Sequence, residues 1–408
     1  MQFKLQKVNQ MLFSDYTLFF DIFLFVLIFS ACKFIFKKNW LNNVLILLGN
    51  ALILTKIVSP RSVFILFMVS LIMYGAGIIL RKRKFKWLLA IMLSLLIAVF
   101  SVRNYPLVQS WFGEWWDAFM QKHFFSVEKL GLSYIFFRMI HWLVECYRQN
   151  IRSINVLSYV NYLFFFPTFP AGPIDTFNNF HYWVNKTHLR FNLIMLLAGV
   201  GRIFVGAVKL LLIVPLIKEY AVDYNALLPY MGAWSAVCLA ALLYSIYIYI
   251  DFSGYCDVAI GTAYMLGIRT PENFRLPYLS SNIAEFWKRW HMTFSSFLKM
   301  YVFKPVIALV NRTPIVKYRM LVSVIAYLVT FFVCGLWHGS TLNFVFWGLW
   351  HGIGLSIYKV ATNKNAGRNN GSLSKIMGVA VTFVFVTVGW IFFNYPVEQL
   401  VEMFNLLF

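Results

Sequence analysis

Long apolar runs, separated by short polar or basic segments, recur along almost the whole chain and limit its fold more than any other feature. A helix needs about 20 mostly apolar residues to cross a bilayer. The clearest candidate spans are residues 17–36, 62–80, 87–101, 129–147, 191–217, 229–250, 317–337 and 376–393. Shorter or interrupted apolar runs lie at 41–55, 155–170, 255–268 and 341–359. The pattern predicts an all-α polytopic membrane protein with about 11 transmembrane helices.

The distribution of charge supports the same fold class. Only 12% of the residues are charged, whereas soluble domains carry about 25%. The net charge of +21 would suggest nucleic-acid binding in a soluble chain. Here, however, basic residues cluster at the ends of apolar runs, as in Lys37-Lys38 and 81–84. This is typical of membrane topology signals and of attraction to anionic lipid, so we expect a lipid bilayer and no nucleic acid as partner.

The basic clusters also predict a topology. If Lys37-Lys38 and 81–84 are both cytoplasmic, two spans must lie between them, and the runs 41–55 and 62–80 supply two. The N-terminus would then face outward. The first apolar run is long and lacks a small-residue cleavage site, so we expect it to be retained as a span.

The segment 270–315 is more polar than the rest. A loop ending at Asn282 predicts a helix N-cap, with the helix beginning at about Ile283. Lys288 and Arg289 occupy one face of that helix. Aromatic residues recur at four-residue spacing on another face, namely Phe286, Trp290 and Phe294. We expect an amphipathic helix that is too polar to span and lies in, or dips into, the membrane.

Two copies of Gly-Leu-Trp-His-Gly, at 335–339 and 348–352, place histidines in apolar surroundings. An ionisable residue at membrane depth is costly, and histidine is suited to moving a proton near neutral pH. His338 closes a long apolar run, so we favour catalysis over an interfacial histidine beside a belt tryptophan. His351 lies 13 residues later, about 220° around a continuous helix. The two imidazoles could share a face only if the helix breaks at 339–342, and a packing role for His351 is equally open.

Other polar residues near the apolar runs give weaker predictions. His291 can meet His338 only through tertiary folding, and it could instead face lipid headgroups. Asp251 and Ser253 could cap a helix that begins at Gly254, while Asp257 inside that helix needs a partner. Neither the five scattered cysteines nor the spacing of histidines and carboxylates predicts a metal site. The sequence also lacks the motifs of nucleotide-driven pumps and serine hydrolases.

Four motifs in sequence order resemble the membrane-bound O-acyltransferase family. They are the segments 249–261, 271–278, 285–292 and 335–339, and the likeness covers roughly residues 130–360. The resemblance implies one membrane domain over residues 1–408, with a ring of helices around a thin core where funnels from the two faces meet. The N-terminal spans 17–101 and the C-terminal span 376–393 would flank the motif core.

The resemblance also implies roles for individual residues. It places the family's catalytic histidine, as general base, at His338 and a second polar position of the site at His291. Further candidate site residues are His351, Trp337 and Asp251. Lys288 and Arg289 are candidates for binding an anionic acyl carrier or its phosphate, with a plain solvated face as the alternative.

Two bacterial branches of the family share local motifs with this chain. Residues 165–168 and 172–175 resemble the D-alanyl transfer proteins of teichoic acid export, whereas 346–351 resembles alginate and peptidoglycan O-acetylases. Lys299-Met300 departs from both branches. We favour D-alanyl transfer to a hydroxyl of a cell-envelope polymer, with O-acetyl transfer as the alternative. A proton-coupled transporter or flippase, or a scaffold without catalysis, are alternatives of other classes.

The same resemblance implies the reaction's other participants. The donor would be an acyl thioester, either on a phosphopantetheine carrier protein in the cytoplasm or as acetyl-CoA, and no bound cofactor or metal is expected. An extracytoplasmic acyl-transfer protein would be a further partner. The location implied is the bacterial cytoplasmic membrane, crossed many times.

Overall fold

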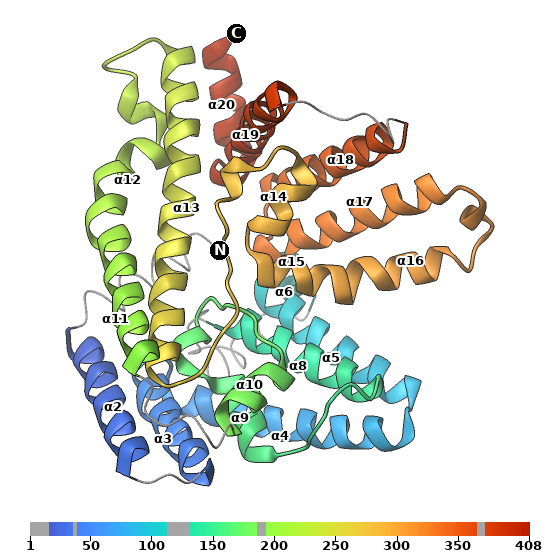
Figure 1. Ribbon diagram of the computed structural model, residues 1–408. Helices are drawn as coiled ribbons and strands as arrows, with labels where there is room; N and C mark the ends of the chain where they lie inside the picture. The colour runs from blue at the N-terminus through green and yellow to red at the C-terminus, as the bar shows by residue number, and fades with distance from the viewer. Residues whose placement is uncertain (1–15, 36–38, 112–130, 186–192, 365–371) are drawn as a thin grey trace. The chain divides into compact units, whose positions relative to one another are not determined.

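The computed structural model describes residues 16–35, 39–111, 131–185, 193–364 and 372–408 (Figure 1). Helices form most of this part of the chain, and no strand occurs in it, so the all-α prediction is confirmed. Seven of these helices are long and apolar enough to cross a membrane, which supports a multi-pass membrane protein. The predicted number of about 11 spans is not confirmed. The seven are 40–57, 60–83, 193–222, 233–265, 292–310, 319–338 and 373–394.

The chain divides into two compact units, of which unit 1 comprises residues 1–208 and 254–271. Its helices pack pairwise, with α3 against α9 and α4 against α8. The helices of unit 1 are α2 (Tyr16–Ile35), α3 (Asn39–Ile57), α4 (Pro60–Arg83), α5 (Lys86–Asn104), α6 (Pro106–Ser110), α8 (Leu132–Tyr147), α9 (Val156–Phe164), η1 (Phe166–Thr168), α10 (Phe177–Asn185), α11 (Leu193–Ala207) and the end of α13 (Ala233–Met265).

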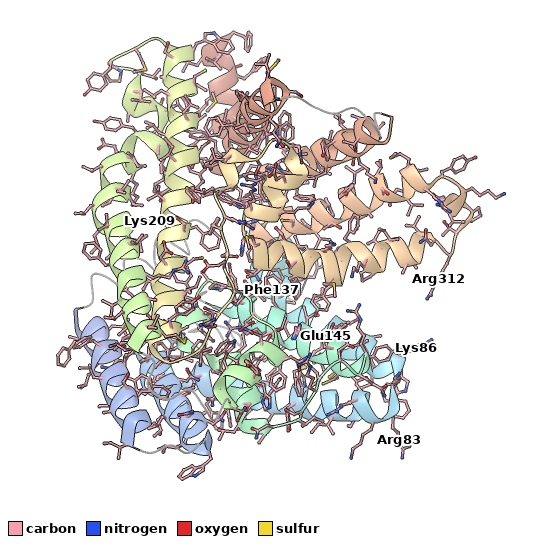
Figure 2. All side chains as sticks on the ribbon, viewed as in Figure 1. Arg83, Lys86, Phe137, Glu145, Lys209 and Arg312 are labelled. Atoms are coloured by element: carbon pink, nitrogen blue, oxygen red, sulfur yellow. The ribbon has the colours of Figure 1, made fainter. Side chains whose placement is uncertain are left out.

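The basic cluster 81–84 ends helix α4. Lys84 adopts a left-handed conformation, and its backbone N–H donates to the carbonyl oxygen of Leu80, which closes the helix. Figure 2 labels Arg83 and Lys86 at the turn between α4 and α5. Helices α3 and α4 lie between this cluster and positions 37–38, as the predicted topology requires. Lys37-Lys38 lie outside the described residues.

A buried arginine holds the proline-broken segment between α9 and α10. Arg138, 1% exposed, donates from Nη1 to the carbonyl oxygens of Tyr162 and Leu163 at 3.0 and 2.8 Å. Its Nη2 donates to the carbonyl oxygen and to Oγ1 of Thr168, at 2.8 and 2.6 Å. The carbonyls that the broken helix leaves unpaired are thus satisfied inside the protein.

Unit 2 comprises residues 209–253 and 272–408. Its largest interface joins α17 and α18, which lie side by side as an antiparallel pair (Figure 1). Its elements are η2 (Val208–Ile213), α12 (Val214–Val222), η3 (Tyr224–Leu227), the start of α13, η4 (Pro277–Leu279), α14 (Ile283–Arg289), α15 (Met292–Leu298), η5 (Lys299–Phe303), α16 (Lys304–Val310), η6 (Pro314–Lys317), α17 (Arg319–His338), α18 (Leu342–Lys364), α19 (Ser372–Asn394) and α20 (Val397–Leu407).

Glycines of the doubled pentapeptide bring the backbones of α17 and α18 together. A β-carbon at Gly335 would lie 2.3 Å from the carbonyl oxygen of Phe344. One at Gly348 would lie 2.3 Å from the carbonyl oxygen of Phe331 and 3.2 Å from Cα of Gly335. The two copies of the motif therefore face each other across this interface, at a distance that only glycine permits.

Two separate segments, 229–250 and 255–268, were predicted where the structure has one helix, α13, of 33 residues. Asp251 and Ser253 lie inside this helix and cap nothing, so the predicted cap is wrong. Ser253 is accommodated because its hydroxyl donates back to the carbonyl oxygen of Ile250. The partner predicted for Asp257 is confirmed: Nη2 of Arg202 lies 2.8 Å from its Oδ1.

The predicted helix from Ile283 through His291 is broken. Asn282 caps α14 as predicted, but the helix ends at Arg289, and His291 has a φ of 42° before α15 begins. The cause is tertiary: the N–H of Arg275 donates to the carbonyl oxygen of Arg289, and the N–H of Met292 donates to that of Asn273. Residues 292–310 are also apolar enough to span, contrary to the prediction.

Candidate active site

His338 is the last residue of α17, and its imidazole stands among aromatic rings. Those of Trp337 and Trp347 lie 4.6 and 4.8 Å from it, centroid to centroid, and that of Phe393 lies at 4.9 Å. These rings come from α17, α18 and α19, so three helices fix the imidazole. The residue is half-buried. His338 therefore combines a mostly apolar environment with partial access from outside.

His291 lies close to the same group of rings, although 47 residues separate it from His338. It is 2% exposed, and its imidazole contacts Phe252 at 4.8 Å and Phe294 at 5.0 Å. The rings of Phe294 and Trp337 contact both imidazoles. Tertiary folding thus brings the two predicted histidines into contact with the same pair of rings.

His351 lies on α18, and the break that it needs to approach His338 is present at 339–341. The ring of Trp347 contacts both histidines, His338 at 4.8 Å and His351 at 5.1 Å. His351 has no exposed surface, and neither of its ring nitrogens has a hydrogen-bond partner within the described residues. This enclosure favours packing over direct contact with a substrate.

A buried asparagine, Asn273, holds His291 in position. Its Oδ1 lies 3.0 Å from Nδ1 of His291. The same oxygen accepts hydrogen bonds from the backbone N–H and the hydroxyl of Thr293, at 3.3 and 2.9 Å. The backbone carbonyl of Asn273 also accepts from Met292. One asparagine therefore fixes the backbone and the side chain of this turn.

Lys288 and Arg289 line a cavity of about 560 Å³. Its polar lining residues are Arg275, Asn282, Glu285, Lys288, Arg289 and Tyr358. Glu285 accepts a hydrogen bond from Arg289 and others from the backbone N–H and hydroxyl of Ser281. The backbone N–H of Ser281, more than any other group, lowers the pKa of Glu285, so this carboxylate stays ionised and neutralises Arg289. Within the described residues Lys288 and Arg275 have no carboxylate partner, so the cavity has net positive charge.

The structure separates the predicted site residues into three groups. His338, His291 and Trp337 meet in one aromatic cluster, while Lys288 and Arg289 line the cavity. Asp251 is buried on α13, and the residue of that helix that contacts His291 is its neighbour Phe252. No three potential metal ligands gather anywhere in the part of the chain that the structure describes.

Residues that the sequence did not single out complete the site. They are Phe252, Asn273, Arg275, Trp347 and Phe393. For Asn273 and Arg275 a signal existed, because both lie in the segment 271–278 that carries part of the family resemblance. Phe252 and Trp347 likewise lie in the resembling segments 249–261 and 346–351, whereas nothing marks Phe393 among the 43 phenylalanines of the chain.

Comparison with known proteins identifies the family of the chain. The pattern that defines the membrane-bound O-acyltransferase family matches residues 80–397, most of the chain. The chain belongs to this family. The matched region contains all three histidines, the cationic cavity and both copies of the pentapeptide.

Individual relatives within the family act on different polymers. The teichoic acid D-alanyltransferase of Bacillus subtilis is 31% identical over 280 residues, which are 65% of this chain and 68% of that protein. The peptidoglycan O-acetyltransferase of Helicobacter pylori is 29% identical over 295 residues, 65% of this chain and 54% of that protein. A probable alginate O-acetylase of Pseudomonas syringae is 32% identical over 271 residues.

The match covers 65% of this chain and 48% of the Pseudomonas protein, so the chain spans about half the length of its O-acetylase relatives. Family and relatives alike support an acyltransferase. The relatives also act on cell-envelope polymers, which is consistent with a membrane enzyme that modifies such a polymer.

Proposed function

We propose that the chain transfers an acyl group from a thioester donor to a hydroxyl of a cell-envelope polymer, with His338 as general base. The observation that carries this proposal is the position of His338. It is half-buried, enclosed by three aromatic rings and located at a helix end, within a chain of the acyltransferase family.

Acyl transfer from a thioester requires a general base for the acceptor hydroxyl and a site shielded from bulk water. A neutral His338 takes the proton of the acceptor hydroxyl as its oxygen attacks the thioester carbonyl carbon. The tetrahedral intermediate then collapses, the carbon–sulfur bond breaks, and the thiolate receives the proton. The products are an ester and a thiol. General base catalysis of this kind contributes about 10²- to 10⁴-fold in rate.

Two other groups of residues have supporting roles in this proposal. His291, which shares the rings of Phe294 and Trp337 with His338, orients the acceptor hydroxyl or relays its proton. Lys288 and Arg275 bind a phosphate of the donor, because they are the cationic residues of the cavity that Glu285 does not hold. Arg289 contributes less to phosphate binding than its sequence position suggested, because Glu285 neutralises it.

The acyl group that we propose is D-alanyl, supplied by a phosphopantetheine carrier protein in the cytoplasm. An extracytoplasmic acyl-transfer protein and a teichoic-acid-type polymer are the partners in this proposal, and the location is the bacterial cytoplasmic membrane. The similarity to a D-alanyltransferase over 68% of its length supports it. O-acetyl transfer from acetyl-CoA is the second candidate, because the O-acetylases match at nearly the same identity.

The test uses the purified full-length chain in liposomes, given a radiolabelled D-alanyl carrier thioester or radiolabelled acetyl-CoA. Thiol release and label on a hydroxyl-bearing polymer are measured for the wild type, His338→Gln and His181→Gln. His181 is a matched control, a histidine of unit 1 that bonds Ser153 and Asn185. We expect transfer to fall about 10²- to 10⁴-fold in His338→Gln alone. Undiminished transfer in His338→Gln would refute the assignment, and label movement without thioester cleavage would favour a transporter.

A further inference from the structure

The hydrogen bonds at Asn273 identify which nitrogen of His291 carries its proton. Amide oxygen and nitrogen atoms are hard to tell apart, and so are the two tautomers of a neutral imidazole. Here a backbone N–H removes the ambiguity. The N–H of Thr293 can only donate, and it lies 3.3 Å from Oδ1 of Asn273. The atom that faces it must therefore be the oxygen.

The position of this oxygen determines the state of the imidazole. Nδ1 of His291 lies 3.0 Å from the same Oδ1, which has no proton to give. Nδ1 must therefore carry the hydrogen and donate it. A neutral imidazole has one N–H, so Nε2 is left with a lone pair. Nε2 is buried and has no hydrogen-bond partner within the described residues.

The surroundings of His291 do not supply a competing charge. The rings in contact with it belong to Phe252, Phe294 and Trp337, from α13, α15 and α17. The titratable or charged residues nearest to these contacts in sequence are Asp251, Glu272, Arg275, Arg289 and His338. None of them forms a hydrogen bond or ion pair with His291 in the described part of the chain. Asn273 therefore decides the tautomer.

We propose that Asn273 is a positioning residue that holds His291 in the Nδ1–H tautomer, so that the lone pair of Nε2 is available to orient the acceptor hydroxyl or relay its proton while His338 acts as the general base. This inference rests on the proposed function for its catalytic consequence, but the tautomer itself does not depend on it. The backbone agrees with a functional constraint. His291 keeps a φ of 42°, a costly value for this residue, and the carbonyl of Asn273 holds the turn through Met292.

The tautomer can be measured without any enzymatic activity. The full-length protein is labelled with ¹⁵N-histidine, reconstituted in liposomes and studied by solid-state NMR, and the His291 signals are assigned by their loss in His291→Gln. We expect a single Nδ1-protonated tautomer in the wild type and a mixture in Asn273→Leu. Asn343→Leu is the control, since Asn343 is also buried in unit 2 but bonds Phe392. A wild-type Nε2-protonated ring, or identical spectra for the wild type and Asn273→Leu, would overturn the proposal.

A second variant tests the consequence for catalysis. Asn273→Asp keeps the accepting oxygen but adds a negative charge that favours the imidazolium, as an opposite charge within about 4–6 Å does. We expect the acidic limb of the pH–rate profile to move up by about 1 to 3 pH units, and Asn273→Leu to lose about 10- to 100-fold in rate. A pH profile for Asn273→Asp that superimposes on that of the wild type contradicts the positioning role. A wild type that transfers no acyl group refutes the proposed function and leaves the NMR result standing.

Discussion

Replacing Gly335 by alanine is a direct test of whether the α17–α18 contact positions the site. The new β-carbon would lie 2.3 Å from the carbonyl oxygen of Phe344 and 3.1 Å from its carbon. Ordinary contact begins at 3.4 Å. Both neighbouring atoms belong to the backbone, so no side chain can rotate away. The two helices must separate locally by about 1 Å, only three residues before His338.

The expected magnitudes follow from this geometry. Overpacking of a tight interface costs about 1–3 kcal/mol, while alanine gains about 0.5–1 kcal/mol over glycine within a helix. We therefore expect a net loss of up to about 2.5 kcal/mol in the free energy of unfolding. A shift of about 1 Å in a catalytic group can cost about 10²-fold in rate, so activity should fall even under conditions in which the variant stays folded.

The assay compares Gly335→Ala with Gly201→Ala and Gly75→Ala, at whose β-carbons no heavy atom lies within 4 Å. All three changes are the same chemically and lie within helices. Thermal unfolding in detergent measures stability, and acyl transfer in liposomes measures activity. The controls should be as stable as the wild type or slightly more stable, with unchanged transfer. If Gly335→Ala has the same unfolding temperature and the same transfer rate as Gly201→Ala, this backbone contact does not fix the position of His338.

Two further predictions concern charge. Burial raises the pKa of Asp175, in the loop before α10, to about 7, so the folded protein retains a proton that the unfolded chain releases near pH 4. Stability should therefore fall as the pH rises through this window, and Asp175→Asn should flatten the dependence of the unfolding temperature on pH between about 4 and 7. An unchanged slope would contradict this. Lys288→Gln should raise the KM for a phosphate-bearing thioester roughly 10-fold with little change in kcat, because the charge binds donor and transition state alike. Arg312→Gln, an exposed cation in the turn between α16 and η6 (Figure 2), is the matched control, and equal effects of the two changes would exclude a specific donor site.

Features set by local sequence were predictable, and features set by tertiary contacts were not. The apolar runs predicted α3 and α4 to within a few residues, because crossing a bilayer imposes a length on each run. The cap at Asn282 was also local. The continuity of α13 was missed because Ser253 bonds back within the helix, and nothing in the sequence distinguishes that from a cap.

The candidate site follows the same division. Its histidines could be identified because an imidazole in an apolar run is conspicuous. Their arrangement could not, because the break at His291 depends on hydrogen bonds between 273–275 and the ends of α14 and α15. The charge of the cationic cavity could also not be predicted from sequence alone. Sequence placed Lys288 and Arg289 together, but only the structure shows that Glu285 neutralises one of them.

Aromatic rings form much of the surroundings of the three histidines. Trp337 contacts both His291 and His338, and Trp347 contacts both His338 and His351. Such rings fill space rigidly and are not themselves proton acceptors. A cluster of carboxylates in the same place would hold a proton permanently on the imidazole and remove the base. If His338 is the general base, as we propose, the aromatic residues around it serve to keep its imidazole available for proton transfer, in addition to packing the helices.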